Sequence, residues 1–485
     1  MSTFSGLNTA YSGLVAARQG LDVVGQNIAN ANTEGYTRQR VTTSSVAAAA
    51  DAGRLDGGVR AGQGVSVDGI ARLGSAPFDS QVRFSAAEAG YSAVRANALS
   101  ALETSLREPG DSGLSTRLQE FWGGWQDMSN RAGEAAPAAL LLGQAGDLAT
   151  QVSQGYQAVT AQWSGLRADA VGMVSELNNA ATQVAELNGR IRMVLATGGS
   201  ANELIDQRSA LTTTIAALSG ATVRELPDGT VDVGIGGNAL VSGDRARAIA
   251  VTGSTRLEGA AADAVRLVWT NPATPVSLDG GELAGALSVL AAANGSGTGG
   301  ALAEAAASYN AFATHLATTV NDIHRLGATS TNSTGLADGL DFFAFDPTRA
   351  ALSLRVIPTD LSGIAAARPG AGARDGSIAD AIAQLGAGKA VDASGAAIAS
   401  PDTAWASFVT AVAVDTRMGL QQARLADLTA TSARGRQLSN SSVDLDEENV
   451  NLLMLQHAYQ GAARVMTAVD EMLDTLINRT GLVGR

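Results

Sequence analysis

The stretch LNTAYSGLVAARQGLDVVGQNIANA occupies residues 7–31 and repeats its apolar positions every seven residues. The repeat has two registers, the second three residues after the first: Leu7, Leu14, Leu21 and Ile28, then Ala10, Ala17, Val24 and Ala31. This spacing predicts a helix whose apolar stripe pairs with another helix in a coiled coil.

The other end of the chain carries the same pattern in LLMLQHAYQGAARVMTAVDEMLDTL, residues 452–476. Its registers are Leu452, Tyr459, Met466 and Leu473, then Leu455, Ala462, Val469 and Leu476. Asp444 and Glu447 precede the stripe with the spacing of a capped helix start, where acidic residues also complement the helix dipole. We therefore expect the two chain ends to pair along a seam.

Glycines interrupt the N-terminal stripe at positions 6, 13, 20 and 25. Each glycine inside a helix costs about 1 kcal/mol relative to alanine. A helix weakened in this way is marginal alone in water, so we expect it to order only against a partner helix or neighbouring subunits.

The interior predicts a helical bundle. Apolar residues recur with helical spacing from Val152 to Ala196 without a proline, which corresponds to a helix about 65–70 Å long at 1.5 Å per residue. Further helices are expected at 86–107, 114–131, 303–325 and 403–437. Such segments are typical of a bundle packed around the long helix.

Strand patterns lie between the helices. Residues 222–226 and 230–235 are rich in β-branched residues and flank a Pro-Asp-Gly turn, which predicts a hairpin. We expect the tracts 221–290 and 346–400 to form a β-rich outer domain and the glycine-rich segment 294–300 to be a flexible connection.

The predicted fold is mostly α with an inserted β-rich domain, in a nested architecture of paired terminal coiled-coil helices, a long helical bundle domain and an outer β domain. The terminal assembly domain comprises 1–40 and 441–485. The bundle comprises 41–220, 301–345 and 403–440, with 41–85 as an extended or β connection. The outer domain comprises 221–300 and 346–402.

Composition excludes several classes of protein. The 33 basic against 46 acidic residues, a net charge of −13, argue against a nucleic-acid partner. The absence of cysteine excludes disulfides, zinc thiolates and thiol nucleophiles. No apolar run approaches 18 residues, and the N-terminus lacks the features of a cleaved signal, so neither a membrane span nor Sec export is expected.

No motif indicates an enzyme, a cofactor or a metal. The chain has three histidines, none with the spacing of metal ligands: His315, His324 and His457. Residues 234–239 match a dinucleotide fingerprint only loosely and favour a turn, because no amphipathic helix follows. Trp122 and Trp125 are more typical of a bundle core than of a carbohydrate platform. The acidic residues at 444–448 fit a capped helix better than a cation site.

Residues 12–40 resemble the N-terminal signature of the rod, hook and hook-associated proteins of the bacterial flagellum, and include Asn27, Asn30, Gly35 and Tyr36. Residues 441–476 resemble the C-terminal signature of the same superfamily. The stretches 108–116, 121–127, 201–209 and 228–241 resemble the hook-associated protein 1 family. Glu34 stands where the family often has proline.

The resemblance implies a structural subunit at the hook–filament junction, outside the cell, that polymerises through its terminal helices after type III export. It implies contacts with hook protein, hook-associated protein 3, other copies of the chain and an export chaperone on the C-terminal helix. The assembly residues would be Leu7, Leu14, Leu21, Val24, Asn27, Ile28, Asn30, Gly35 and Tyr36, with Leu452, Leu455, Tyr459, Met466, Val469, Leu473 and Leu476 on the C-terminal helix, which would also bind the chaperone.

Other functions remain open on sequence alone. A hook or distal-rod subunit would share both end signatures but not the long bundle helix or the 108–116 segment. An enzyme carried on the flagellum would need paired carboxylates or a metal site within 221–400, and neither is visible. A secreted adhesin would use the outer domain, and deletion of 346–400 would separate that role from assembly.

Overall fold

The computed structural model describes residues 3–47, 62–391 and 395–479. The chain forms two compact units. The first contains Met1–Ala86, Leu177–Arg247 and Leu428–Arg485, and the second contains Ala87–Glu176 and Ala248–Asp427. Parts of the predicted terminal, connecting and outer domains, at 1–2, 48–61, 392–394 and 480–485, lie outside the described residues.

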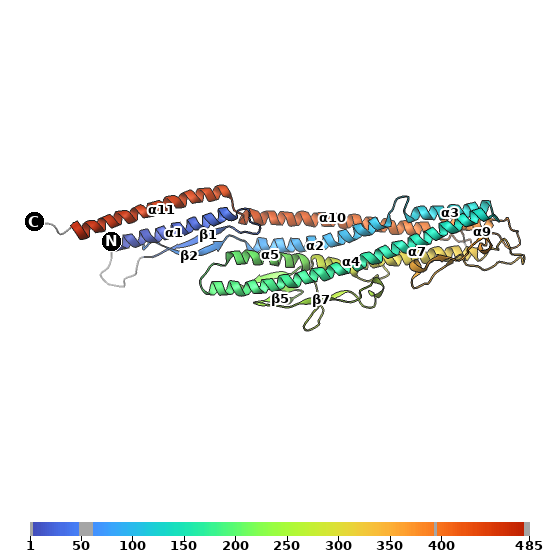
Figure 1. Ribbon diagram of the computed structural model, residues 1–485, viewed down its shortest axis with the longest axis horizontal. Coiled ribbons are helices and arrows are strands. Elements are labelled where there is room, and N and C mark those ends of the chain that lie inside the picture. The colour runs from blue at the N-terminus through green and yellow to red at the C-terminus, as the bar shows by residue number, and fades with distance from the viewer. Residues whose placement is uncertain (1–2, 48–61, 392–394, 480–485) are drawn as a thin grey trace, which may run out of the picture. The chain divides into compact units, whose positions relative to one another are not determined.

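Helices dominate the described chain (Figure 1). They are α1 (Thr3–Asn30), α2 (Ala76–Leu106), α3 (Leu114–Asn130), α4 (Ala135–Ala196), α5 (Asn202–Ser219), α6 (Gly281–Leu290), α7 (Ala301–His324), α8 (Ala350–Ser353), α9 (Ser377–Gly386), α10 (Pro401–Ser441) and α11 (Leu445–Asp474). The described part of the chain contains no helix that is long and apolar enough to cross a membrane.

The strands are short and antiparallel. They are β1 (Gln39–Ser45), β2 (Val65–Arg72), β3 (Thr222–Glu225), β4 (Val231–Ile235), β5 (Asn238–Ser242), β6 (Arg245–Ala246), β7 (Ile249–Thr252), β8 (Arg266–Trp269), β9 (Phe343–Ala344) and β10 (Arg355–Val356). Strands β3 to β6 form one sheet in sequence order, and β1 pairs with β2, β7 with β8, and β9 with β10.

In the first unit, α11 lies along α1 (Figure 1). The buried face of α1 includes Ala10, Ala17, Val23 and Val24. A separate core forms where the end of α4 meets α5, from Leu187, Ile191 and Ala201 with the partly buried Val194, Leu204, Ile205 and Leu211. The first unit therefore joins a helix pair to a small α and β body.

The predicted β3–β4 hairpin is confirmed, and a buried arginine ties it to the helices. Thr222 pairs with Gly234 and Glu225 with Val231. Arg208 of α5 donates hydrogen bonds to Asn188 Oδ1 at 2.9 Å and to the Gly229 carbonyl at 2.7 Å. Burial lowers the pKa of Arg208 to about 10.

The core of the second unit is aromatic. Phe121 and Trp125 of α3 pack against Phe342 and Phe343, with ring centroids between 4.9 and 6.1 Å apart. Trp122 is also buried, and its Nε1 donates to an Asp402 carboxylate oxygen at 2.7 Å. Both tryptophans of α3 therefore belong to the core, as the sequence predicted.

The predicted helices are confirmed, and α2, α4 and α10 extend beyond the predicted ranges. The long helix begins at Ala135 instead of 152, because Pro137 falls in its first turn, where proline needs no backbone donor. In the tract 346–402 the described strand content is lower than expected. Helix α9 lies there because Ile378, Ile382 and Leu385 bury one face at helical spacing. The predicted domain boundaries stay a prediction.

Candidate assembly interface

Helices α1 and α11 pack against each other, and the predicted assembly residues on them are buried to different degrees. On α1, Val24 is buried, and the four leucine and isoleucine positions of the first register are partly buried. On α11, Val469 is buried and Leu452, Leu455, Met466 and Leu473 are partly buried, whereas Tyr459 and Leu476 are 37% and 55% exposed. The structure thus packs α1 against α11 and places Leu7, Leu455, Met466 and Val469 where the two helices meet.

A groove of about 740 Å³ runs between the two helices on one side. Its walls are Leu7, Asn8 and Tyr11 from α1 and Ala463, Met466, Thr467 and Asp470 from α11. Tyr11 is 57% exposed at its edge. The groove is mostly apolar, so water gains little from occupying it.

A second apolar stripe of α11 faces away from the seam. It consists of Val450, Leu453, Met454, Val465 and Met472, each more than half exposed. These residues lie outside the two heptad registers of the seam, so the heptad spacing does not predict this stripe. Leaving these side chains in water is unfavourable, so this stripe is a candidate interaction surface.

The signature residues converge where α1 ends and α11 begins. Asn27 is 1% exposed and its amide nitrogen donates to the Gln39 carbonyl at 2.9 Å and to Glu448 Oε2 at 3.1 Å. Its oxygen accepts from the Tyr36 hydroxyl at 2.9 Å and from the Gln39 backbone nitrogen at 3.0 Å. Asn27 therefore has a partner for all four of its hydrogen-bonding positions.

Arg38, which follows the turn after α1, also contacts Glu448. Its Nε and Nη2 each lie 2.7 Å from Glu448 Oε1, and its Nη1 lies 2.9 Å from Glu447 Oε2. The Glu448 side chain is 1% exposed, whereas that of Glu447 is 59% exposed. The hydrogen bond with Glu447 is the main cause that raises the pKa of Arg38.

The remaining signature residues shape the turn after α1. Asn30 donates to the Gln26 carbonyl at 3.0 Å and accepts from Thr33 Oγ1 at 3.1 Å. Gly35 has a φ of +80°, a conformation that favours glycine. Glu34, in the usual place of proline, accepts from Arg434 at 2.8 Å and is exposed.

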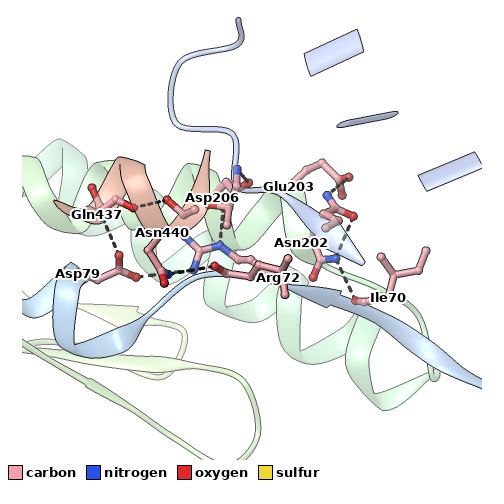
Figure 2. Close-up of polar contacts among 12 residues, drawn as sticks. Ile70, Arg72, Asp79, Asn202, Glu203, Asp206, Gln437 and Asn440 are labelled. Atoms are coloured by element: carbon pink, nitrogen blue, oxygen red, sulfur yellow. Dashed lines mark hydrogen bonds and ion pairs between the residues drawn. The ribbon is translucent and has the colours of Figure 1, made fainter. Parts of the chain in front are cut away.

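Helix α5 holds the extended segment that follows the turn. Asp206 accepts from the Thr37 backbone nitrogen at 3.0 Å. Asn202 donates to Gln39 Oε1 and to the Ile70 carbonyl, both at 3.0 Å (Figure 2). Both residues lie in the 201–209 stretch singled out in the sequence, so this stretch positions the entry to β1 and the end of β2.

Arg72, at the end of β2, links α5 to α2 and α10. Its Nε donates to Asp206 Oδ1 at 2.6 Å, and its Nη1 lies 3.6 Å from an Asp79 carboxylate oxygen. Gln437 of α10 donates to the other Asp79 oxygen at 2.6 Å, and Asn440 donates to the Leu73 carbonyl at 3.5 Å. Figure 2 shows these side chains pointing toward one another from four separate segments.

The acidic surroundings change the titration of Tyr36. Burial raises its pKa to about 12, and the nearby charges of Glu203, Asp206 and Glu448 act in the same direction. The hydroxyl therefore stays a hydrogen-bond donor to Asn27 at any physiological pH. Within the described residues no group of three His, Cys, Asp or Glu side chains could hold a metal ion.

The sequence did not show the polar roles of four residues around the signature: Arg38, Arg72, Asp206 and Glu448. Glu448 was visible as part of a helix start, but not as a buried partner of Asn27. The signal in the sequence was that Glu448 lies one heptad before Leu455, which puts a charged residue at a seam position of an otherwise apolar stripe.

Comparisons with known proteins agree with this geometry at both chain ends. Residues 7–37 match the family described as flagella basal body rod protein, and residues 435–479 match the flagellar basal body rod FlgEFG protein C-terminal family. With the paired terminal helices, these matches define the class: the chain is a structural protein of the flagellar axis and not an enzyme.

The middle of the chain identifies the family. Residues 99–343 match the flagellar hook-associated protein FlgK helical domain. The chain belongs to the FlgK family of flagellar hook-associated proteins.

Curated relatives of this chain carry the name of the same family. Flagellar hook-associated protein 1 of Bacillus subtilis (strain 168) is 28% identical over 518 residues, covering 100% of both chains. The protein of the same name from Escherichia coli (strain K12) is 30% identical over 252 residues, which is 51% of this chain and 45% of that relative. The Salmonella typhimurium relative is 32% identical over 44% of its own length.

A solved structure shows the same fold. The flagellar hook junction protein FlgK from Burkholderia pseudomallei matches with a TM-score of 0.62 at 15% sequence identity, over 74% of this chain and 100% of that one.

Proposed function

We propose that this chain forms the junction between hook and filament and polymerises there through α1 and α11. The observation that carries the proposal is the apolar stripe of α11 that α1 leaves exposed, beside the groove between the two helices. Burial of apolar surface is worth roughly 25 cal/mol per Å². Head-to-tail contacts between such surfaces of successive subunits generate a helical polymer.

The proposed neighbours are other copies of the chain, hook protein and hook-associated protein 3. The predicted seam residues would act indirectly: Leu21 and Leu473 hold the helix pair together, and the pair presents the exposed stripe. The predicted domains have corresponding roles in this proposal, with the ends for assembly and the middle for the outer surface.

Export through the flagellar type III apparatus, to a position outside the cell, is part of the same proposal. The glycines of α1 weaken that helix in isolation, which makes an unfolded state easier to reach before export. The exposed stripe of α11 would cause self-association in the cytoplasm, so a chaperone that covers α11 before export has a clear physical purpose.

A single charge in the exposed stripe tests the assembly role. Val465→Asp places a carboxylate where 51% of the valine is exposed, so the folded subunit tolerates it but a buried interface does not. We expect a strain that carries this variant as its only copy to secrete the subunit, to lack filaments and to be non-motile, as seen by electron microscopy and swimming assays.

Met193→Asp provides the matched control. Met193 lies on α4 in the same unit and is 71% exposed, away from the stripe. The control strain should build filaments and swim. Normal filaments with Val465→Asp would refute the role of the stripe.

A further inference from the structure

Three contacts between α1 and α11 fall in one regular column. A Cβ atom built on Gly6 would lie 3.8 Å from Val469, and one built on Gly20 would lie 2.8 Å from Leu455. One heptad beyond Gly20, Asn27 bonds to Glu448, which is one heptad before Leu455. Each step towards the C-terminus on α1 corresponds to an equal step towards the N-terminus on α11. The two helices are therefore antiparallel, and the three contacts are successive layers of one seam.

The glycine layers of this column specify the register weakly. Glycine has no side chain to insert between the residues of the facing helix. Nothing lies within 4 Å of a Cβ built on Gly13, the layer between Gly6 and Gly20. A shift of α11 by one heptad would place Gly20 opposite Ala462, or Gly13 opposite Leu455, and would again pair small residues with apolar ones.

The polar layer tolerates no such shift. Asn27 and Glu448 are each 1% exposed, and Arg38 places two nitrogens on Glu448 Oε1. One heptad of slip in one direction would put Leu455 opposite Asn27. The amide and the guanidinium would then lose the buried carboxylate, which is costly for buried polar groups.

We propose that Asn27, Arg38 and Glu448, here called the register cluster, set the register of α1 against α11. The three act as positioning residues, and the apolar layers supply the affinity between the helices. This inference concerns the single chain and goes beyond the proposed junction role. It also determines how far the exposed stripe of α11 is displaced along α1.

Disulfide trapping in the full-length chain tests the register directly, because the natural sequence has no cysteine. The pair Gly20→Cys with Leu455→Cys reports the observed register. The pairs Gly20→Cys with Ala462→Cys and Gly13→Cys with Leu455→Cys report a slip of one heptad in either direction. A heptad of helix is about 10.5 Å long, well beyond the reach of a disulfide, so each pair reports one register.

Each pair is compared in three backgrounds: unchanged, Glu448→Met and Asn27→Leu. Glu447→Gln is the matched control, because it removes an exposed partner of Arg38 and leaves Glu448 in place. In the unchanged and control chains we expect the observed pair to dominate. In Glu448→Met and Asn27→Leu we expect the ratio of observed to slipped disulfide to fall at least about tenfold.

Three results would overturn the proposal. Equal trapping of all pairs in the unchanged chain would mean that no register is defined. An unchanged ratio in both variants would mean that the short connection from α10 to α11 sets the register. Equal loss of all three disulfides would mean that the cluster holds the helices together and does not choose between registers.

Discussion

Asp206 shows how one side chain can join segments that are far apart in sequence. It accepts from Thr37 and from Arg72 while being only 8% exposed. A carboxylate is suited to this position because it accepts from several donors at once, and bonds to charged groups are stronger than neutral ones.

Replacement of Asp206 by asparagine should therefore destabilise the first unit. The amide keeps the shape but gives Arg72 a neutral partner, and we expect the free energy of unfolding to fall by about 2 kcal/mol. The rate of hydrogen exchange at the α5 amides measures this loss of stability locally. Asp244→Asn is the control, because its ion pair with Arg192 is exposed on both sides; an equal effect of both substitutions would contradict the assigned role.

His324 predicts a pH dependence in the second unit. Its Nδ1 lies 2.7 Å from the Leu340 carbonyl, and its Nε2 accepts from the Ala365 backbone nitrogen at 2.9 Å. Only neutral imidazole can do both. Burial lowers the pKa of His324 below 6.5 despite the opposing charges of Asp338 and Asp341, and the Trp125 ring lies beside it.

Because the folded pKa is depressed, protonation favours the unfolded state. Stability is complete above pH 6.5 and declines as the pH falls below it. Urea unfolding at pH 8 and pH 5, followed by tryptophan fluorescence, should show a smaller pH effect in His324→Gln than in the unchanged chain. His457→Gln should keep the full effect, because His457 is exposed. Equal pH effects in all three chains would exclude His324 as the cause.

The glycines of helix α1 have two different effects: they lower the stability of the helix, and some of them make room for side chains of α11. The sequence indicated only the first effect. Gly13 and Gly20 both weaken the helix, but only Gly20 contacts α11 closely. The leucine at position 455 fills the space that a side chain at position 20 would need. Some glycines of α1 are therefore part of the seam and not merely a weakness in the helix.

Gly13→Ala should slow hydrogen exchange in α1, by up to about 1 kcal/mol of added helix stability. Gly20→Ala gives the same gain in helix propensity but forces Leu455 to move. The net gain in stability of α1 should therefore be smaller than for Gly13→Ala, or negative. Exchange mass spectrometry of the two variants gives the comparison. Equal protection in both would mean that α1 and α11 do not pack as described.

Periodicity predicted the helices well and the polar contacts poorly. The stripes on α1, α4 and α11 are properties of short windows of sequence, which is why heptad spacing found them. Glu448 lies 421 residues from Asn27, and Asp206 lies 169 residues from Thr37, so only the fold shows that these polar residues meet. The tract 346–400 was expected to be β-rich, and α9 was not predicted there because its helical spacing extends over only ten residues.

At the scale of the whole molecule, each unit has its own stabilising features. The first relies on a helix pair, short sheets and a polar network, whereas the second has an aromatic core that contains Trp125, Phe342 and Phe343. Such a division suits a subunit whose ends assemble with neighbours while its middle stays folded. The chain termini carry the general axial signatures, and the middle carries those of the FlgK family.

In the proposed assembly, α11 contacts neighbouring axial subunits through its exposed stripe. A photo-crosslinking amino acid placed at Val465, in flagella isolated from cells, tests this contact, with the same substitution at Met193 as control. We expect crosslinks from position 465 to another flagellar axial protein and none from position 193. Flagella that contain the subunit but yield no axial crosslink from position 465 would contradict it.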